Sequence, residues 1–112
     1  MLTENSTAQL INLYYDVYVP EGATGPMPLM IALHGYEGNK ESMMARARSI
    51  NGRDFVIAAL QGPNAFLIRG GDKPRVGFGW MMQYKSEDSI KLHHSAVLSV
   101  IEETGARYQI DR

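Results

Sequence analysis

The stretch PLMIALHGYEGNKESM, from Pro28 to Met43, decides the fold that the sequence predicts. Its residues Leu29–Leu33 are uniformly apolar, which is typical of a strand that is covered on both faces. The strand ends abruptly in His-Gly-Tyr, and Asn39 then offers a side chain suited to the N-cap of a helix. The stretch therefore predicts a buried strand, a short loop and a helix, the basic unit of a parallel α/β sheet.

The helix after Asn39 is expected to pack one face against this strand. That face consists of residues spaced by four and three positions: Met43, Ala47 and Ile50. We expect the helix to end at Gly52, because glycine readily takes the left-handed conformation that ends many helices.

Two other segments predict strands. From Ile11 to Val19 the side chains alternate between two faces with a period of two, and many of them are aromatic or β-branched. The run Phe55–Leu60 is uniformly apolar, like Leu29–Leu33, and Gln61-Gly62-Pro63 ends it. Pro20–Pro28 separates the first two strands and is predicted to be a loop, since prolines and glycines interrupt regular pairing.

The second half of the chain predicts a long loop and a helix. The residues from Asn64 to Tyr84 show no clear period and are rich in glycine, so we predict a loop there. Ser86 is expected to cap a helix that ends at Gly105. The helix should bury one stripe of residues: Ile90, His94, Val97, Leu98 and Ile101. Apolar strands that alternate with helices indicate an α/β fold with a mostly parallel sheet flanked by helices.

The composition is that of a folded chain: 112 residues, of which 45% are hydrophobic, suffice for one small domain. Its eleven basic and twelve acidic side chains nearly cancel, so we expect neither nucleic acid nor an anionic membrane as a partner. The lack of cysteine excludes disulfides, zinc–thiolate sites and cysteine nucleophiles. We find no secretory signal and no run long enough to span a membrane, and we therefore expect a cytoplasmic protein.

Four segments resemble the N-terminal half of α/β-hydrolases of the phospholipase/carboxylesterase kind, namely PLMIALHGY, FVIAALQGP, GFGW and SEDSIKLHHSAVLSVIEETGARYQIDR. The resemblance covers roughly residues 10 to 112. It implies that residues 1–112 form the N-terminal part of a single α/β-hydrolase domain. It also implies a partial α/β-hydrolase fold, truncated before the strand that carries the nucleophile.

The resemblance implies a role for the loop His34-Gly35-Tyr36. In the family, the backbone N–H just after His-Gly points at the carbonyl oxygen of an ester, as half of an oxyanion hole. By position this donor is the N–H of Tyr36, with Gly35 permitting the turn and the close approach of the backbone. The His34 side chain is expected to brace the loop rather than to transfer protons. Tyr36 and Trp80 are candidate substrate-binding residues, although Trp80 could equally be an ordinary core or rim residue.

The nucleophile of the family lies in G-x-S-x-G, and none of the serines in this sequence has glycine two positions before and two after it. The implied function is that of a carboxylic-ester hydrolase, esterase or lysophospholipase-like, with a small-molecule ester as substrate and neither cofactor nor metal. We expect the 112 residues alone to be inactive. The family's strand order leaves one edge of Leu29–Leu33 unpaired, so we also expect self-association through that edge.

Two further hypotheses stay open at this point. His93 and His94 could suggest a metal site, but adjacent helical residues diverge by about 100° and cannot easily share an ion, so a core role is favoured for His94. The chain could also be a non-catalytic α/β domain that binds a small ligand at its strand ends or a partner at its sheet edge. The segment Arg69–Gly79 lacks the spacing of a phosphate-binding loop.

Overall fold

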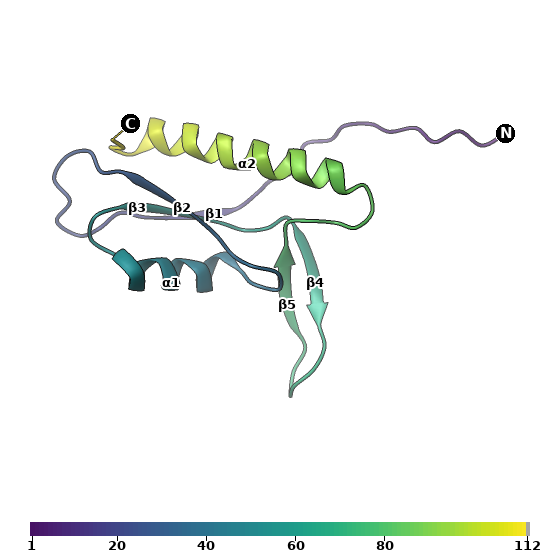
Figure 1. Cartoon of the computed structure of the whole chain (residues 1–112), viewed down its shortest axis with the longest axis horizontal. Coiled ribbons are helices and arrows are strands. Elements are labelled where there is room, and N and C mark those ends of the chain that lie inside the picture. The colour runs from purple at the N-terminus through teal and green to yellow at the C-terminus, as the bar shows by residue number, and fades with distance from the viewer. Residues whose placement is uncertain (112) are drawn as a thin grey trace.

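The computed structural model describes residues 1–111, and these form a mixed α/β fold with two small sheets and two helices (Figure 1). In chain order the elements are β1 (Tyr15–Tyr18), β2 (Leu29–Leu33), α1 (Lys40–Asn51), β3 (Val56–Leu60), β4 (Asn64–Ile68), β5 (Arg75–Gly79) and α2 (Ser86–Arg107). Neither helix of the described residues is both long and apolar enough to cross a membrane.

The larger sheet has the strand order β1-β3-β2, with β3 in the middle and buried at every residue. β2 pairs with β3 in parallel, from Leu29 opposite Val56 to Leu33 opposite Leu60. Both apolar runs are therefore strands, as predicted. The first strand is shorter than the predicted Ile11–Val19, because Tyr15 already pairs with Leu60, the last residue of β3. β1 is also antiparallel to β3, so the sheet is mixed.

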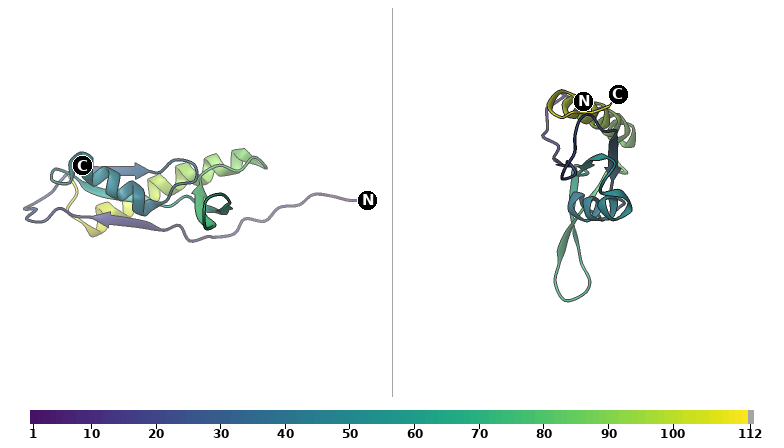
Figure 2. Two further views of the ribbon diagram at one scale, coloured as in Figure 1. Left: turned by 90° about the horizontal axis from the view of Figure 1, so that it is seen from below. Right: turned by 90° about the vertical axis from the view of Figure 1, so that its left-hand side faces the viewer.

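The two helices cover opposite faces of this sheet (Figure 2). On one face Ala47 of α1 packs against Ile57 and its neighbours in β2 and β3. On the other face Ala96 and Val100 of α2 pack against Ala58 and Leu60. Because successive residues of a strand point to opposite faces, the uniformly apolar β3 fills both halves of the core.

α1 begins as predicted, since the Asn39 side-chain oxygen accepts a hydrogen bond of 2.8 Å from the backbone N–H of Ser42. It ends at Gly52, as predicted, but Gly52 does not have the predicted conformation. Gly52 has φ −97°, outside the left-handed region, and Ile50 is exposed rather than buried. The Tyr18 hydroxyl instead donates to the Gly52 carbonyl at 3.2 Å, so the helix end gains a partner without a left-handed glycine.

The predicted orientation of α2 is wrong. Its buried residues are mostly small: Ser89, Ala96, Val100 and Thr104. Leu98 is 65% exposed, Ile90 42% and Ile101 38%, although all three belong to the stripe predicted to face the core. The face of α2 that carries these small residues is turned toward the sheet, which turns the larger apolar residues outward. His93 consequently packs inward and His94 is exposed, the reverse of the prediction.

Both predicted ends of α2 are also wrong. Ser86 is the first helical residue, and the capping position belongs to Lys85, whose φ is +56° and whose side chain makes no capping bond. The helix passes through Gly105 and ends at Arg107, where the N–H of Tyr108 donates to the carbonyl of Thr104.

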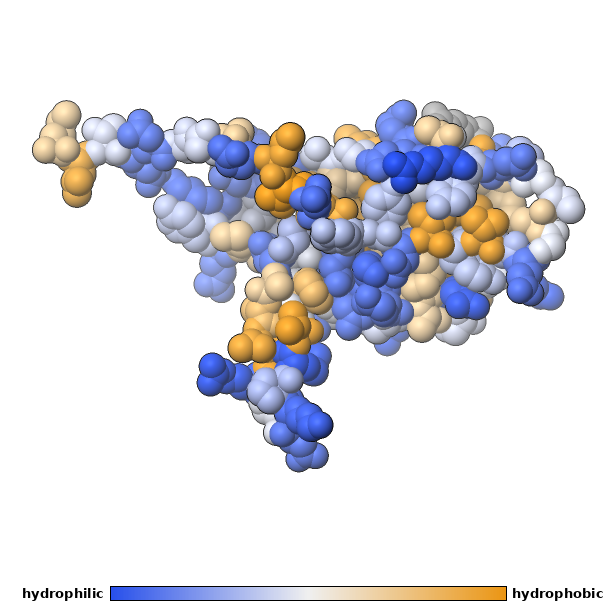
Figure 3. Space-filling view, turned by 180° about the vertical axis from the view of Figure 1, so that it is seen from behind, coloured by the Kyte–Doolittle hydropathy of each residue, from blue (hydrophilic) through white to orange (hydrophobic). Residues whose placement is uncertain are grey.

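The predicted loop from Asn64 to Tyr84 contains a β-hairpin, formed by β4 and β5, that projects from the body of the molecule (Figure 1). Its glycines concealed the strand signal. A Cβ at Gly77 would lie 2.9 Å from the backbone oxygen of Glu37, so the packing of the turn against the hairpin requires glycine there. Figure 3 shows apolar side chains near the base of the hairpin and polar ones at its tip. Leu67 and Val76, a cross-strand pair, are both exposed.

Candidate functional site

The segment after β2 forms a tight turn at the carboxyl end of that strand. The N–H of Gly38 donates to the carbonyl of Gly35 at 3.0 Å, which closes a four-residue turn. Within it Glu37 has φ +70°, whereas Tyr36 has a negative φ. A positive φ at the third residue alone is the pattern of a type II turn, in which that position usually holds glycine. A glutamate there is a strained residue, and such residues concentrate at functional sites.

The His34 side chain is buried and both of its ring nitrogens bond to the backbone. Nε2 accepts the N–H of Gly62 at 2.8 Å, and Nδ1 lies 2.7 Å from the carbonyl of Gly35. Because Nε2 accepts, the ring proton is on Nδ1, which donates to Gly35. The ring thus links the turn after β2 to the segment after β3, and neither nitrogen is available for proton transfer.

Trp80 completes this connection from a third segment. Its Nε1–H donates to the carbonyl of His34 at 3.1 Å, and the two rings lie 5.4 Å apart. The other side of the indole stacks on His93 of α2, with 4.3 Å between the ring centres. The four segments that carry the family resemblance therefore meet around His34.

The segment after β3 is also attached to the start of α1. The Gln61 side-chain oxygen accepts the backbone N–H of Lys40 at 2.7 Å. Lys40 Nζ in turn lies 2.8 Å from Asp16 and 2.9 Å from Glu41, and these contacts raise the pKa of Lys40, the bond to Asp16 contributing most. The Lys40 charge is thus engaged by two carboxylates.

The hairpin holds the turn from its outer side. The N–H of Glu37 donates to the carbonyl of Phe78, and the N–H of Phe78 donates to the carbonyl of Gly38, both at 3.1 Å. The Tyr36 ring stacks on Phe66 of β4, with 5.1 Å between the ring centres. Sequence reasoning missed these partners because it assigned the hairpin to a loop. The short apolar run Ala65–Ile68 was the available signal.

Among residues 1–111, the backbone N–H of Tyr36 has no hydrogen-bond acceptor, although the N–H groups of Glu37 and Gly38 beside it are paired. The Tyr36 side chain is 77% exposed. Tyr36 does not line any of five cavities identified among the described residues. None of these five therefore provides the crevice expected around this amide, which belongs to an exposed turn.

Gly35 differs from the expectation that glycine permits the turn. Its φ is not positive, and a side chain added there would meet no atom of the described residues within 4 Å. The steric constraint lies on other glycines. A Cβ at Gly62 would lie 2.7 Å from the Gly79 carbonyl oxygen, and one at Gly38 would lie 3.0 Å from the Gly35 carbonyl oxygen. Glycine at position 35 leaves open space beside the Tyr36 amide.

Trp80 borders a cavity of about 430 Å³ between α2 and the segment before β1. Tyr36 and Trp80, the two candidate substrate-binding residues, therefore do not line a common cavity. The Nε2 atom of His93 is buried and has no hydrogen-bond partner in the described part of the chain. Burial lowers the pKa of His93, and the neighbouring His94 lowers it further. Residues 1–111 contain no group of three metal-binding side chains.

Comparisons with protein-family models, with curated proteins and with solved structures found no match to this chain. The family resemblance and the oxyanion role of the turn therefore stay predictions.

Proposed function

We propose that this chain supplies the oxyanion-binding turn of a serine carboxylic-ester hydrolase, with the Tyr36 N–H as one of the donors. The observation that carries the proposal is the amide of Tyr36, which has no acceptor among the described residues, in a turn where the N–H groups of Glu37 and Gly38 and the carbonyls of Gly35 and Gly38 are bonded. A fixed donor of this kind stabilises the negative charge that develops on the oxygen of a reacting ester.

The bracing of the turn is consistent with this role. An oxyanion donor contributes most when it does not have to reorganise during the reaction, and this turn is held from several sides. His34 and Trp80 hold it from the core, and Phe78 holds it from the hairpin. The strained φ of Glu37 is then a consequence of the surrounding bonds, which fix the direction of the Tyr36 peptide.

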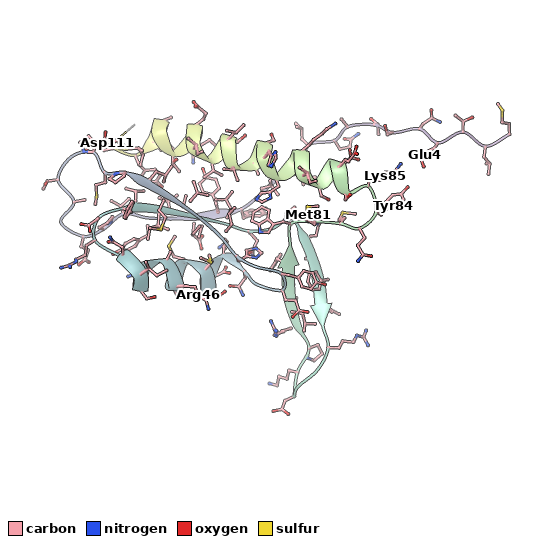
Figure 4. The ribbon with its side chains drawn as sticks, viewed as in Figure 1. Glu4, Arg46, Met81, Tyr84, Lys85 and Asp111 are labelled. Atoms are coloured by element: carbon pink, nitrogen blue, oxygen red, sulfur yellow. The ribbon has the colours of Figure 1, made fainter. Side chains whose placement is uncertain are left out.

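The proposal requires a nucleophile that the 112 residues do not contain, since no G-x-S-x-G occurs in them. One contact supports a position for the strand that would carry this nucleophile. Ile110 pairs in parallel with Met27, just before β2, through bonds of 3.1 Å and 2.8 Å. Figure 4 shows Asp111, which forms one of these bonds, at the end of α2. A strand continuing from Ile110 in this register would run along β2 and end beside Tyr36.

The test compares two variants that differ in the backbone donor. Proline is favoured at the second position of a type II turn, so Tyr36→Pro removes the N–H while preserving the turn. Tyr36→Ala removes the same aromatic ring but keeps the N–H. Each variant is combined with a polypeptide that carries the serine strand, acid and histidine of a carboxylesterase, and hydrolysis of a nitrophenyl ester is measured.

We expect the Pro variant to lose a factor of about 10²–10³ in kcat relative to the Ala variant, which is the usual effect of removing one oxyanion donor. Equal rates for the two variants would refute the assignment of the Tyr36 amide. The 112-residue chain alone should show no turnover and no labelling by a fluorophosphonate. Turnover by a pure monomeric sample would contradict the proposal that the serine, acid and histidine come from another polypeptide.

A further inference from the structure

One nitrogen of the His93 ring is covered by protein and has no partner. The ring of this α2 residue packs inward on Trp80, and its Nε2 atom meets neither a donor nor an acceptor in the described part of the chain. Because described residues already cover Nε2, any further segment could reach it only by displacing them. The missing partner is therefore a property of this packing.

The missing partner determines which charge state of His93 fits this position. A neutral imidazole can carry its proton on Nδ1 and leave Nε2 as a bare acceptor. An imidazolium carries an N–H at both nitrogens, so it would bury a charged donor without an acceptor. Stacking of the cation on the indole of Trp80 offsets part of this cost but supplies no acceptor. The stacked position therefore favours the neutral ring.

The surroundings of His93 also disfavour a positive charge. Burial lowers the pKa of His93, and its neighbour His94 lowers it further through charge repulsion. The residues four positions before and after His93 on α2 are Ser89 and Val97, which are uncharged. The strands beneath α2, β2 and β3, consist only of apolar residues. Within residues 1–111, no carboxylate shifts the pKa of His93.

Trp80 connects the His93 ring to the turn after β2. His93 stacks on the indole with 4.3 Å between the ring centres, and the indole Nε1–H donates to the carbonyl of His34 at 3.1 Å. His34, whose ring nitrogens both bond to backbone, accepts the N–H of Gly62 in turn. Movement of the His93 ring away from Trp80 would therefore uncover the indole that holds His34 at the start of the turn.

We infer that His93 is a pH-dependent support of this turn: the neutral ring stacks on Trp80 and fixes it, whereas the protonated ring turns out to water and releases it. His93 is half-buried, so its ring has a short path to solvent. The pKa of a ring in water is near the ordinary 6.5, and that of the stacked ring is lower. The released form therefore gains on the stacked form as the pH falls below 6.5, by at most about tenfold per pH unit. The inference does not depend on the proposed hydrolase function.

The first test uses the fluorescence of Trp80, which is the only tryptophan in the sequence. As the pH is lowered from 7 to 5, we expect its emission maximum to move to longer wavelength, because the released indole becomes hydrated. His93→Phe keeps an aromatic ring on Trp80 without a titratable group and should abolish the shift. His94→Gln is the matched control. It should keep the shift and move its midpoint to higher pH, because the repulsion from His94 is removed.

The second test follows the turn and the His93 ring by NMR in the unaltered chain, so it does not rely on a variant that might not fold. The ring of His93, the Nε1–H of Trp80 and the amide of Gly62 should titrate with one midpoint, below pH 6.5. Circular dichroism should stay constant over the same range.

Three results would overturn the inference. One is a wavelength shift that persists in His93→Phe. Another is a titration of the His93 ring that leaves the wavelength and the Gly62 amide unchanged, since the protonated ring would then have stayed stacked. The third is a loss of helix that coincides with the shift, which would assign it to unfolding of the whole chain.

Discussion

The end of β2 and the side of β2 differ sharply in how their backbone groups are paired. Beyond its carboxyl end, the turn from His34 to Gly38 is bonded to two other loops and to the hairpin, and the amide of Tyr36 at its exposed tip has no acceptor within residues 1–111. Along its side, the strand presents a row of backbone groups that have no partner in the described part of the chain. A free amide in a braced turn suits recognition of a small charged atom, whereas a row of free backbone groups suits another strand.

The largest expected effect comes from removing the ring that braces the end of the strand. His34→Ala leaves the N–H of Gly62 buried without a partner and leaves a cavity, so we expect a loss of about 3 kcal/mol in unfolding free energy. Urea denaturation measures the change. His34→Gln, whose side-chain oxygen can accept the Gly62 N–H, should lose clearly less. If the two variants are equally destabilised, the bond to Gly62 is not what braces the turn.

The next effect tests the close approach of the segments after β3 and β5. Gly62→Ala places a Cβ 2.7 Å from the backbone oxygen of Gly79 and should cost about 2 kcal/mol, because neither backbone segment can move freely. Thermal unfolding, followed by circular dichroism, gives the change. An unchanged melting temperature would mean that the two segments are more loosely packed than the structure shows.

A smaller effect is expected at Trp80. Trp80→Phe keeps an aromatic ring between His34 and His93 but removes the Nε1–H bond to the His34 carbonyl, so we expect a loss of about 1 kcal/mol. Amide exchange at Gly62 should quicken as well, since both bonds hold the same residue. Exchange that is unaltered in this variant would show that Trp80 acts separately from the brace.

The pH dependence of stability should show a modest contribution from His93. Because burial lowers its pKa below the ordinary value of 6.5, the unfolded chain takes up a proton at a higher pH than the folded chain. The contribution is therefore fully present above pH 6.5 and is lost as the pH falls through the lower folded value. His93→Phe, which preserves the stacking on Trp80, should flatten the decline between pH 7 and pH 5. A decline as steep as that of the wild type assigns it to other groups.

The smallest effect is expected at Gly35. Gly35→Ala meets no neighbouring atom and needs no positive φ, so its stability should stay within about 0.5 kcal/mol of the wild type. The variant separates folding from function. In the complemented hydrolase, the added methyl group should lower the activity if substrate approaches the Tyr36 amide across Gly35. A marked loss of stability would instead mean that the turn requires glycine at position 35, as the sequence suggested.

The sequence predicted the parts of the molecule whose signals are local. The strands Leu29–Leu33 and Val56–Leu60 and the Asn39 cap follow from runs and spacings within a few residues. The hairpin was missed, because the glycine at position 77 is determined by the close approach of the Glu37 backbone, which is 40 residues away in the sequence. The sequence predicted that the His34 side chain braces the loop, but it did not predict the partners Gly62 and Trp80. These lie 28 and 46 residues away, and no local pattern indicates them.

By itself, the sequence determined that two apolar strands alternate with helices and that His-Gly-Tyr follows the first of them. The tertiary structure alone decided which face of α2 is buried, because its neighbours in the fold, Ala58 and Leu60 of β3, pack against Ala96 and Val100 rather than against its larger apolar residues. It also decided which backbone groups stay unpaired. Pairing depends on which strands and loops become neighbours, and that is a property of the whole fold rather than of any one segment.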